Sequence, residues 1–509
     1  MHHDIHQKRI RKSSILKLQT EEGLIEGHAK CAEYLEQSVA SLLLAPANLD
    51  PAAQAILLNE VEPVFTDEDN AMLLALPEKA EIKEVLWSCN QLASPGTDGI
   101  PALLYKEHWN LLGDHLTSIV NAVFEGQQPT LSQQTSLMVF GTKPKKASSI
   151  QAKDKRRISL LNADFKLMTG VEAKRMRKTM KHTVSPLQLV AGDDRRLHHG
   201  IALARDAIHA AGKARLGCGI LDTDLVQAFD WLCMDWVQLV LLKKGMARKA
   251  VTRITNLYYN NLTIVVVNNV LGRIISNLRH CLRQGDKASM EWFCIGIDPV
   301  LTMLDKKLAG IPIISLPVFG PSLPPPAVPP PPIVQKYTIL GYCDDLKPAI
   351  TTMQEFIIVI NCIILFEKSS GCKLHRDPAS KKCKFLPLGR WKGVLTQEDI
   401  PVHFFTLSDY LDMLGVTLKA THTATRKVNG DELVEISKKV MGPWKAGKFM
   451  PLTMRSHSLN TYGFSKLWNR TTVVDLRASD IKARFRFRFI HFCTVYNSIN
   501  NIITIKITN

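Results

Sequence analysis

Two groups of carboxylates follow short apolar runs in this sequence. Asp222 and Asp224 follow the first run, and Asp344 and Asp345 follow the second. Burying an unpaired carboxylate is costly, so acids at the ends of buried strands need a compensating partner. A pair of Mg²⁺ ions is such a partner, because Mg²⁺ prefers oxygen ligands and can activate a hydroxyl and stabilise a leaving pyrophosphate. Taken alone, Asp344-Asp345 is better explained by a polar turn after a strand, because Asp is a favoured turn residue.

Alternating strands and helices are predicted around these acids, which indicates an α/β or α+β core. Strands are expected at 217–221, 260–270 (as a pair) and 337–342. Residues 13–92 are expected to be mostly helical, and further helices are expected at 102–124, 228–244, 286–308 and 353–369.

The charge of the chain favours partners that carry phosphates. The 509 residues include 64 Lys and Arg against 47 Asp and Glu, a formal net charge of +17. Each phosphate that such a surface neutralises releases bound counterions. Two basic runs, at 143–157 and 174–181, flank an apolar segment, and we interpret them as a wall of a binding cleft. A solvated helix face and a charge that serves only solubility are the alternatives.

Composition disfavours several other classes of protein. The 11 Cys residues form no C-x-x-C pair, which argues against a zinc finger or disulfide scaffold and favours reduced thiols inside a cell. The N-terminus lacks the apolar core of a signal peptide, and no apolar run is long enough to span a bilayer, so no membrane partner is expected. The Pro-rich segment 312–332 is expected to form no regular element and to be a linker or surface insertion.

An ordered series of motifs surrounds the two acid groups. In chain order they are S-P-G-T-D-G-I-P at 94–101, R-R-I-S-L-L-N at 156–162, Gln188 with Arg195, Asp224 with Ala228 and Phe229, R-Q-G-D-K-A-S at 283–289, Y-C-D-D at 342–345, S-G-C-K-L at 370–374 and Y-L-D-M-L-G-V at 410–416. This series resembles the reverse transcriptases of non-LTR (LINE-type) retrotransposons. The resemblance covers residues 20–470, and eight motifs in the right order make it specific.

The resemblance implies the chemistry of the two acid groups. Asp224 and Asp344 would be the main ligands of two Mg²⁺ ions, for which Mn²⁺ can substitute, and Asp345 would support them. The ions would promote attack of a primer 3′-hydroxyl on the α-phosphate of a dNTP. Phe229 would lie beneath the sugar and disfavour a 2′-hydroxyl, with core packing as the alternative explanation of this residue.

The resemblance also implies residues that bind the nucleotide. Gln284 and Gly285 would lie against the template base and the nucleotide, since Gly permits close backbone approach and Gln both donates and accepts hydrogen bonds. The alternative explanation of Gln284 and Gly285 is that they only form the turn before a helix. Arg156 would hold the triphosphate with its planar guanidinium, unless it is only a surface cation. The proton donor to pyrophosphate would be one of three lysines, namely Lys373, Lys381 and Lys382.

The fold implied by the resemblance is an α+β, right-hand polymerase fold with fingers, a palm with an antiparallel sheet, and a helical thumb. We expect a helical N-terminal extension at 1–80, fingers at 81–215, and a palm at 216–402 that contains the Pro-rich insertion. The segment 403–509 would contain the strand of Y-L-D-M-L-G-V at 410–416, which corresponds to motif E of the family, and a thumb that ends early. The partners implied are an RNA template, a DNA primer or RNA–DNA hybrid, and dNTP. An endonuclease that acts in trans is a further expectation, because the sequence shows no endonuclease of its own.

Two departures from the family pattern leave a second hypothesis open. Arg157 stands where the pattern has Pro, and Lys287-Ala288 stands where it has Pro-Leu. Such changes suit a catalytically inactive, nucleic-acid-binding relic of a retrotransposon. A third hypothesis is a protein-interaction module that presents the segment 312–332 as a polyproline ligand.

Overall fold

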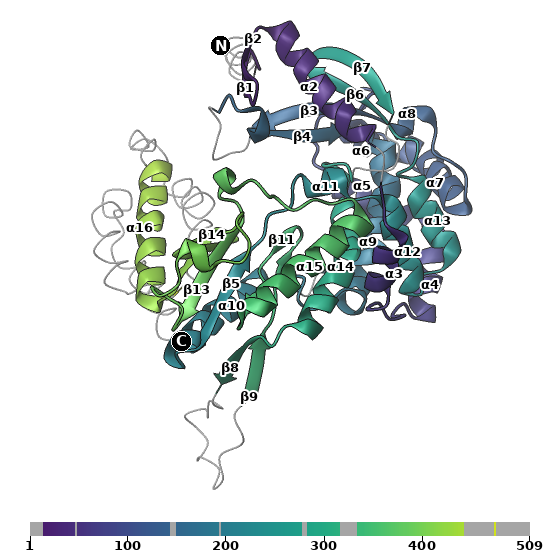
Figure 1. Cartoon of the computed structure of the whole chain (residues 1–509). Coiled ribbons are helices and arrows are strands. Elements are labelled where there is room, and N and C mark those ends of the chain that lie inside the picture. Colours follow the sequence, from purple (N-terminus) through teal and green to yellow (C-terminus); the bar gives the residue numbers. More distant parts are fainter. Residues whose placement is uncertain are drawn as a thin grey trace, which may run out of the picture.

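The computed structural model describes residues 14–45, 48–142, 149–192, 195–276, 282–315, 333–441 and 473–474. Helices and strands are mixed along the whole of this length, so the predicted α+β class is confirmed. Figure 1 shows two sheets in different parts of the molecule, with most of the helices gathered beside them.

The first sheet, which we call the β3 sheet, has the strand order β4-β3-β6-β7 and lies at the top of Figure 1. β3 runs antiparallel to β4 and parallel to β6, and β6 forms a hairpin with β7. Helix α2 packs on this sheet, with Leu35, Val39, Met138 and Val265 in one shared core. The bounds of these elements are α2 (His28–Leu43), β3 (Thr135–Thr142), β4 (Lys155–Leu160), β6 (Leu262–Val267) and β7 (Val270–Ser276).

The N-terminal region is less helical than the sequence predicts. Strands β1 (Lys17–Thr20) and β2 (Gly23–Glu26) form a hairpin ahead of α2. Leu18 is fully buried in the core that α2 shares with the β3 sheet, and this tertiary contact outweighs the helical preference of the local residues. The remaining elements of the region are helices, namely α3 (Pro51–Leu58) and α4 (Asp67–Leu74).

The second sheet, which we call the β5 sheet, has the strand order β12-β5-β13-β14. β5 lies between β12 and β13 and runs antiparallel to both. Because successive side chains of a strand point to opposite faces, Ile220 packs in a core with helix α10, and Leu221 packs in the larger core that contains α15. The bounds are α10 (Leu197–Lys213), β5 (Gly217–Asp222), β12 (Ala349–Ile350), α15 (Met353–Ser370), β13 (Lys384–Gly389) and β14 (Thr406–Leu407).

Two helices that the sequence predicts as continuous are broken. The segment 228–244 forms α11 (Ala228–Trp231) and α12 (Met234–Lys243), because the amide of Cys233 donates to the carbonyl of Ser370 at 2.9 Å instead of continuing α11. The segment 102–124 likewise forms α6 (Ala102–Glu107) and α7 (Trp109–Glu125).

The other helices pack mainly around α9, whose sequence is both charged and largely buried. Arg175 of α9 pairs with Glu81 at 2.7 Å, and Glu172 of α9 pairs with Arg253 at 2.5 Å. These ion pairs compensate the charges that packing removes from water. The helices of this group are α5 (Lys79–Trp87), α8 (Leu131–Gln134), α9 (Ala163–Thr183), α13 (Arg248–Asn256) and α14 (Ser289–Lys307).

The Pro-rich segment begins within a projecting hairpin of β8 (Ile311–Ser315) and β9 (Ile333–Tyr337), which Figure 1 shows at the bottom. Pro312 faces Lys336 across this two-stranded ladder, so the prediction that 312–332 contains no regular element is wrong at its start. A strand with only one partner tolerates Pro, because its other edge needs no amide donor. Residues 316–332 lie outside the described residues.

Short hairpins complete the described chain. β10 (Gly341–Tyr342) pairs with β11 (Asp345–Leu346), and β15 (Tyr410–Met413) pairs with β16 (Val416–Lys419) ahead of helix α16 (His422–Met441). The strand expected at 410–416 is therefore a pair of strands, with a turn at Leu414 and Gly415, which both have positive φ. No helix in the described ranges combines the length and hydropathy that a bilayer span requires. Most of the chain after residue 441 lies outside the described residues.

Candidate nucleotidyl-transfer site

The end of β5 lies beside the turn of the β10–β11 hairpin. The backbone amide and the side-chain hydroxyl of Thr223 both donate to the carbonyl of Leu346, each at 3.1 Å. This bridge brings the segment of Asp224 to the turn that carries Asp344, although more than a hundred residues separate them in the chain. The two acid groups of the sequence therefore lie in one region of the fold.

A buried glutamine holds this turn in place. Cys343 has a φ of 53°, and its backbone amide donates to Gln188 Oε1 at 2.9 Å while its carbonyl accepts from Gln188 Nε2 at 3.3 Å. Gln188 is fully buried, and Arg195 supports its loop by donating to the carbonyls of Ser185 and Gln188. The two residues of the loosely matching motif thus have a definite structural role, which is to fix the turn before Asp344.

The carboxylates repel one another in this region. Burial, together with the charges of Asp345 and Asp224, raises the pKa of Asp344 to about 6. Burial also raises the pKa of Asp222 to about 6, although the nearby Lys347 opposes this shift. The raised pKa of Asp344 means that its ionised form is unfavourable here, which is the electrostatic condition in which a bound cation helps most.

Lys347 is a residue of this site that the sequence did not reveal. Its buried ammonium group donates to both Asp222 and Asp345, and so links the end of β5 to β11. Burial alone would lower the pKa of Lys347, but the two carboxylates outweigh burial and raise it. The position of a lysine two residues after Asp345 was the only available signal.

Asp224 is paired with one of the three candidate lysines. Lys382 Nζ lies 2.8 Å from Asp224 Oδ2, and both side chains are partly exposed. Lys373 instead places its ammonium 3.7 Å from the centre of the Trp231 ring. The structure therefore brings Lys382, rather than Lys373, to the acid group.

Three oxygen-bearing side chains are available to divalent cations, namely those of Asp224, Asp344 and Asp345. In the described part of the chain, no three His, Cys, Asp or Glu side chains are grouped as a ready metal site. Lys382 pairs with Asp224, and Lys347 pairs with Asp345. The donor set itself consists only of carboxylate oxygens, which fits Mg²⁺.

Phe229 lies on α11 and is only partly buried. Its ring stacks on Phe293 with the centroids 4.8 Å apart, and its carbonyl accepts from the amide of Leu282 at 2.8 Å. Both the predicted place beneath a sugar and the alternative of core packing are compatible with a ring that packs on one face and is partly accessible.

Gln284 and Gly285 lie against β4. The carbonyl of Gln284 accepts from the amide of Ser159 at 2.8 Å. Gly285 has a φ of 124°, and a Cβ atom added there would lie 2.4 Å from the carbonyl oxygen of Ser159. Only glycine fits this close approach of two backbones.

Gly285→Ala is expected to destabilise the fold by about 2 kcal/mol, because alanine meets both a steric clash and an unfavourable φ. Thermal unfolding of the purified variant measures this loss. The matched control is Gly212→Ala in α10, where an added Cβ meets nothing within 4 Å. If both variants unfold at the wild-type temperature, the described approach of Gly285 to Ser159 is wrong.

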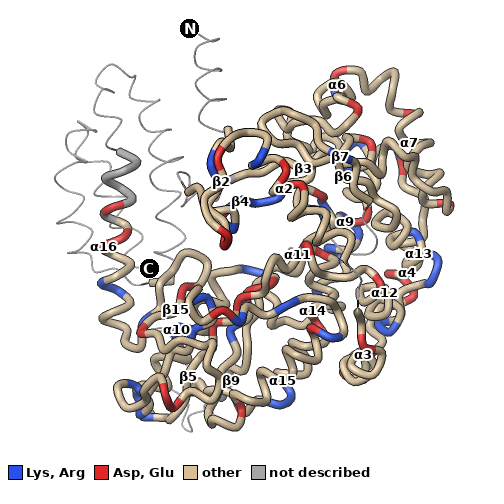
Figure 2. The backbone as a smooth tube through the Cα atoms, turned by 45° about the horizontal axis from the view of Figure 1, so that its top comes forward, with Lys and Arg blue, Asp and Glu red and all other residues tan. Residues whose placement is uncertain are grey.

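The two arginines at the start of the R-I-S motif differ in their surroundings. Arg156 of β4 is exposed, whereas Arg157 forms an ion pair of 3.0 Å with Asp230. The basic runs are only in part a solvent-facing wall, because Arg175 is buried and residues 143–148 lie outside the described residues. In Figure 2 a blue segment marks the basic residues of β4.

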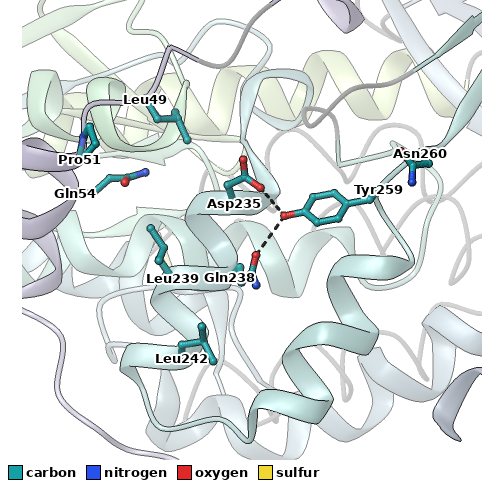
Figure 3. A pocket seen from close by; sticks show the side chains of 9 residues that line it. All are labelled: Leu49, Pro51, Gln54, Asp235, Gln238, Leu239, Leu242, Tyr259 and Asn260. Atoms are coloured by element: carbon teal, nitrogen blue, oxygen red, sulfur yellow. Dashed lines mark hydrogen bonds between the residues drawn. The ribbon is translucent and has the colours of Figure 1, made fainter. Parts of the chain in front are cut away.

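A separate pocket of about 580 Å³ shares no residue with this site. Figure 3 shows the hydroxyl of Tyr259 within it, donating to Asp235 and, at 3.2 Å, to Gln238. The pocket is lined by Leu49, Pro51, Gln54, Asp235, Gln238, Leu239, Leu242, Tyr259 and Asn260.

Comparison with known proteins links this geometry to a family. The family described as "Reverse transcriptase (RNA-dependent DNA polymerase)" matches residues 143–418, which is more than half of the chain. A relative from Xenopus laevis, named "Transposon TX1 uncharacterized 149 kDa protein", is 22% identical over 433 residues. The match covers 84% of this chain but only 31% of the relative, so the chain spans about a third of that protein's length. Together they confirm the resemblance to reverse transcriptases of non-LTR retrotransposons.

Proposed function

Because the chain belongs to the reverse transcriptase (RNA-dependent DNA polymerase) family, we propose that it copies an RNA template by extending the 3′-hydroxyl of a DNA primer with dNTP. The observation that carries this proposal is the meeting of the Asp224 segment with the turn of Asp344 and Asp345. The same site would also accept an RNA–DNA hybrid. Because dNTPs are intracellular metabolites, the reaction would take place inside a cell.

In the proposed mechanism, Asp224 and Asp344, with support from Asp345, would hold two Mg²⁺ ions, or Mn²⁺ in their place. Bound there, the ions neutralise the charge that develops as the hydroxyl attacks the α-phosphate and pyrophosphate leaves. The buried turn around Cys343 keeps Asp344 in one position, since Gln188 holds the peptide on both sides. A positive ion is favoured at this point because burial and the charges of Asp345 and Asp224 together raise the pKa of Asp344.

The remaining residues of the proposal bind the nucleotide. Arg156 is exposed on β4 and would hold the triphosphate. Phe229 would lie beneath the sugar, and Gln284 with Gly285 would contact the template base and the nucleotide. Lys382 would donate a proton to the leaving pyrophosphate, because it is the lysine that reaches Asp224.

In right-hand terms, the proposed palm contains the β5 sheet and the β10–β11 hairpin, and the proposed fingers contain the β3 sheet. The motif E hairpin β15–β16 would lead into a thumb that begins with α16. Helix α2 packs on the β3 sheet, so we assign the N-terminal segment to the fingers rather than to a separate extension of 1–80.

The inactive-relic hypothesis loses its main support in the structure. Arg157 has a buried acidic partner in Asp230. Lys287 donates to the carbonyl of Val85 at 2.9 Å and to Ser88 Oγ at 2.8 Å, at the end of α5. Both departures from the family pattern are therefore integrated in the fold, so they do not indicate decay.

Primer extension tests the proposal. The chain is incubated with an RNA template, an annealed DNA primer, dNTP and Mg²⁺, and extended products are separated by length. We expect template-dependent extension with dNTP and much less with rNTP. Salt-sensitive binding of the hybrid, with no extension in either Mg²⁺ or Mn²⁺, would instead establish the relic.

Lys382→Met is expected to lower the turnover of extension by about 10²- to 10⁴-fold, the range for loss of one general acid. Lys373→Met and Lys381→Met should each have a smaller effect, because neither is seen to reach the acid group. Single-turnover incorporation of one nucleotide measures all three rates. If the rate falls most in Lys373→Met, Lys373 rather than Lys382 is the proton donor to pyrophosphate.

A further inference from the structure

An ion pair next to Phe229 in the chain joins two parts of the fold. Arg157 of β4 donates from Nη1 to Asp230 Oδ2 at 3.0 Å and from Nη2 to Ser38 Oγ at 3.1 Å. We infer that Arg157 is a positioning residue that fixes α11, and with it Phe229, against β4, and so sets how the site accepts the sugar of the incoming nucleotide. The inference rests on the proposed function, because it takes Phe229 as the residue beneath the sugar.

Helix α11 depends on tertiary contacts for its position. It is a single turn of four residues, and it begins after Gln227, whose φ is 45°. So short a helix is not stable alone. Contacts from outside its own segment hold it, including the amide of Leu282 on the Phe229 carbonyl, the stacking of Phe229 on Phe293, the Lys373 ammonium over the Trp231 ring, and Arg157 on Asp230. Replacing Arg157 removes the last of these contacts.

The ion pair is suited to fixing geometry. The side chains of Arg157 and Asp230 are 11% and 5% exposed, so water competes little for their hydrogen bonds. A buried pair adds little net stability compared with apolar side chains of the same size, but it tolerates few arrangements of its two partners. The planar guanidinium also reaches a second acceptor, Ser38, which ties α2 to the same point.

The two neighbouring arginines of β4 have different proposed roles, one in binding and one in positioning. Arg156 and Arg157 are consecutive in a strand, so their side chains point to opposite sides. Arg156 faces solvent, where the triphosphate is proposed to bind, while Arg157 turns to α11. Pairing with Gly141 and Phe140 of β3 keeps both residues in register. The same strand thus relates the proposed triphosphate position to the proposed sugar position.

The kinetic test compares Arg157→Met with Arg157→Lys. Single-nucleotide incorporation on an RNA–DNA hybrid gives kcat and KM for dNTP and for the matching rNTP. We expect Arg157→Met to raise the KM for dNTP and to reduce the preference for dNTP over rNTP, each by at least ~10-fold. Arg157→Lys keeps the charge and should recover part of both. The affinity for the hybrid, measured by fluorescence anisotropy, should stay within about twofold.

A control separates positioning from loss of stability. Arg253→Met removes a comparably buried ion pair, between α13 and Glu172 of α9, at a place that does not touch α11. The double variant Arg157→Met with Asp230→Asn removes both charges of the ion pair together. If the double variant keeps the wild-type KM and sugar preference, or if the Arg253→Met control changes them equally, the inference is overturned.

Hydrogen exchange provides a readout that needs no catalysis. In Arg157→Met, the amides of α11 are expected to exchange at least ~10-fold faster than in the wild type, while those of α12 keep their rates. Unchanged α11 exchange would overturn the inference even in an active enzyme. Faster α11 exchange in a chain that extends no primer would instead show that the positioning contact exists and that the proposed function is wrong.

Discussion

Replacing either Asp224 or Asp344 by Asn is expected to reduce primer extension by at least ~10³-fold while leaving the binding of an RNA–DNA hybrid nearly unchanged. The amide keeps the size of the side chain but removes the charge that holds a divalent cation, and the chemical step depends on that charge. Hybrid binding depends on Lys and Arg contacts to phosphates, which neither substitution touches. Single-turnover extension and a salt-dependent binding assay measure the two quantities.

Asp345→Asn should cost less activity than the other two, since Asp345 is already paired with Lys347. Glu398→Gln, an exposed acid elsewhere on the surface, is the matched control and should extend primers at the wild-type rate. Extension that survives the double change Asp224→Asn with Asp344→Asn would show that the acids do not carry the reaction, and the proposed function would fall with them.

Asp344→Asn should also stabilise the fold when no divalent cation is present. The pKa of Asp344 is raised to about 6 by burial and by neighbouring acids. A raised carboxyl pKa means that the folded state favours the protonated form, so stability is highest at low pH and is lost as the pH rises through about 6. Above that pH the neutral amide of the Asp344→Asn variant avoids the free-energy cost of burying an ionised carboxylate. The melting temperature without cations should therefore rise in the variant at pH 8, and by about half as much at pH 5, where the carboxyl is still partly protonated in the folded state.

The acids proposed for this site were easier to recognise in the sequence than the residues that support them. Asp224, Asp344 and Asp345 stand in local motifs, and the glycine at 285 is needed by the backbone itself, so a linear pattern can carry this information. Gln188 and Arg195 were recognised only as a loose match. Their role depends on a turn at Cys343, over 150 residues away, and such a partner leaves no trace in nearby residues.

Tertiary contacts also explain where the observed helices and strands differ from the predicted ones. The segment 228–244 is helical on both sides of Cys233, as its residues predict. The hydrogen bond from the amide of Cys233 to the carbonyl of Ser370 ends the first helix, α11. The N-terminal hairpin forms because Leu18 is buried with α2 and the β3 sheet. The replacement of Pro by Arg157 suited an inactive relic in the sequence, because its ion-pair partner Asp230 lies on another element. In each case the deciding group is distant in sequence.

Lys347→Met is expected to have the largest effect on stability, a loss of about 3–5 kcal/mol near pH 8. Lys347 is buried between Asp222 and Asp345, and its removal leaves two carboxylates without their cation. Chemical denaturation at equilibrium measures the loss. Lys306→Met removes an exposed pair with Glu60 and should cost at most ~1 kcal/mol.

The pH dependence of this loss tests its electrostatic cause. Burial and Asp345 raise the pKa of Asp222 to about 6 against the opposing effect of Lys347, so the pKa of Asp222 should rise further in Lys347→Met. Protonation then removes the uncompensated charge, and the deficit relative to the wild type should shrink as the pH falls from 8 to 5. Adding Asp222→Asn to Lys347→Met should recover part of the stability at pH 8 for the same reason. A deficit that is equal at both pH values and is not reduced by Asp222→Asn would mean that lost packing of the lysine stem, rather than charge, destabilises the variant.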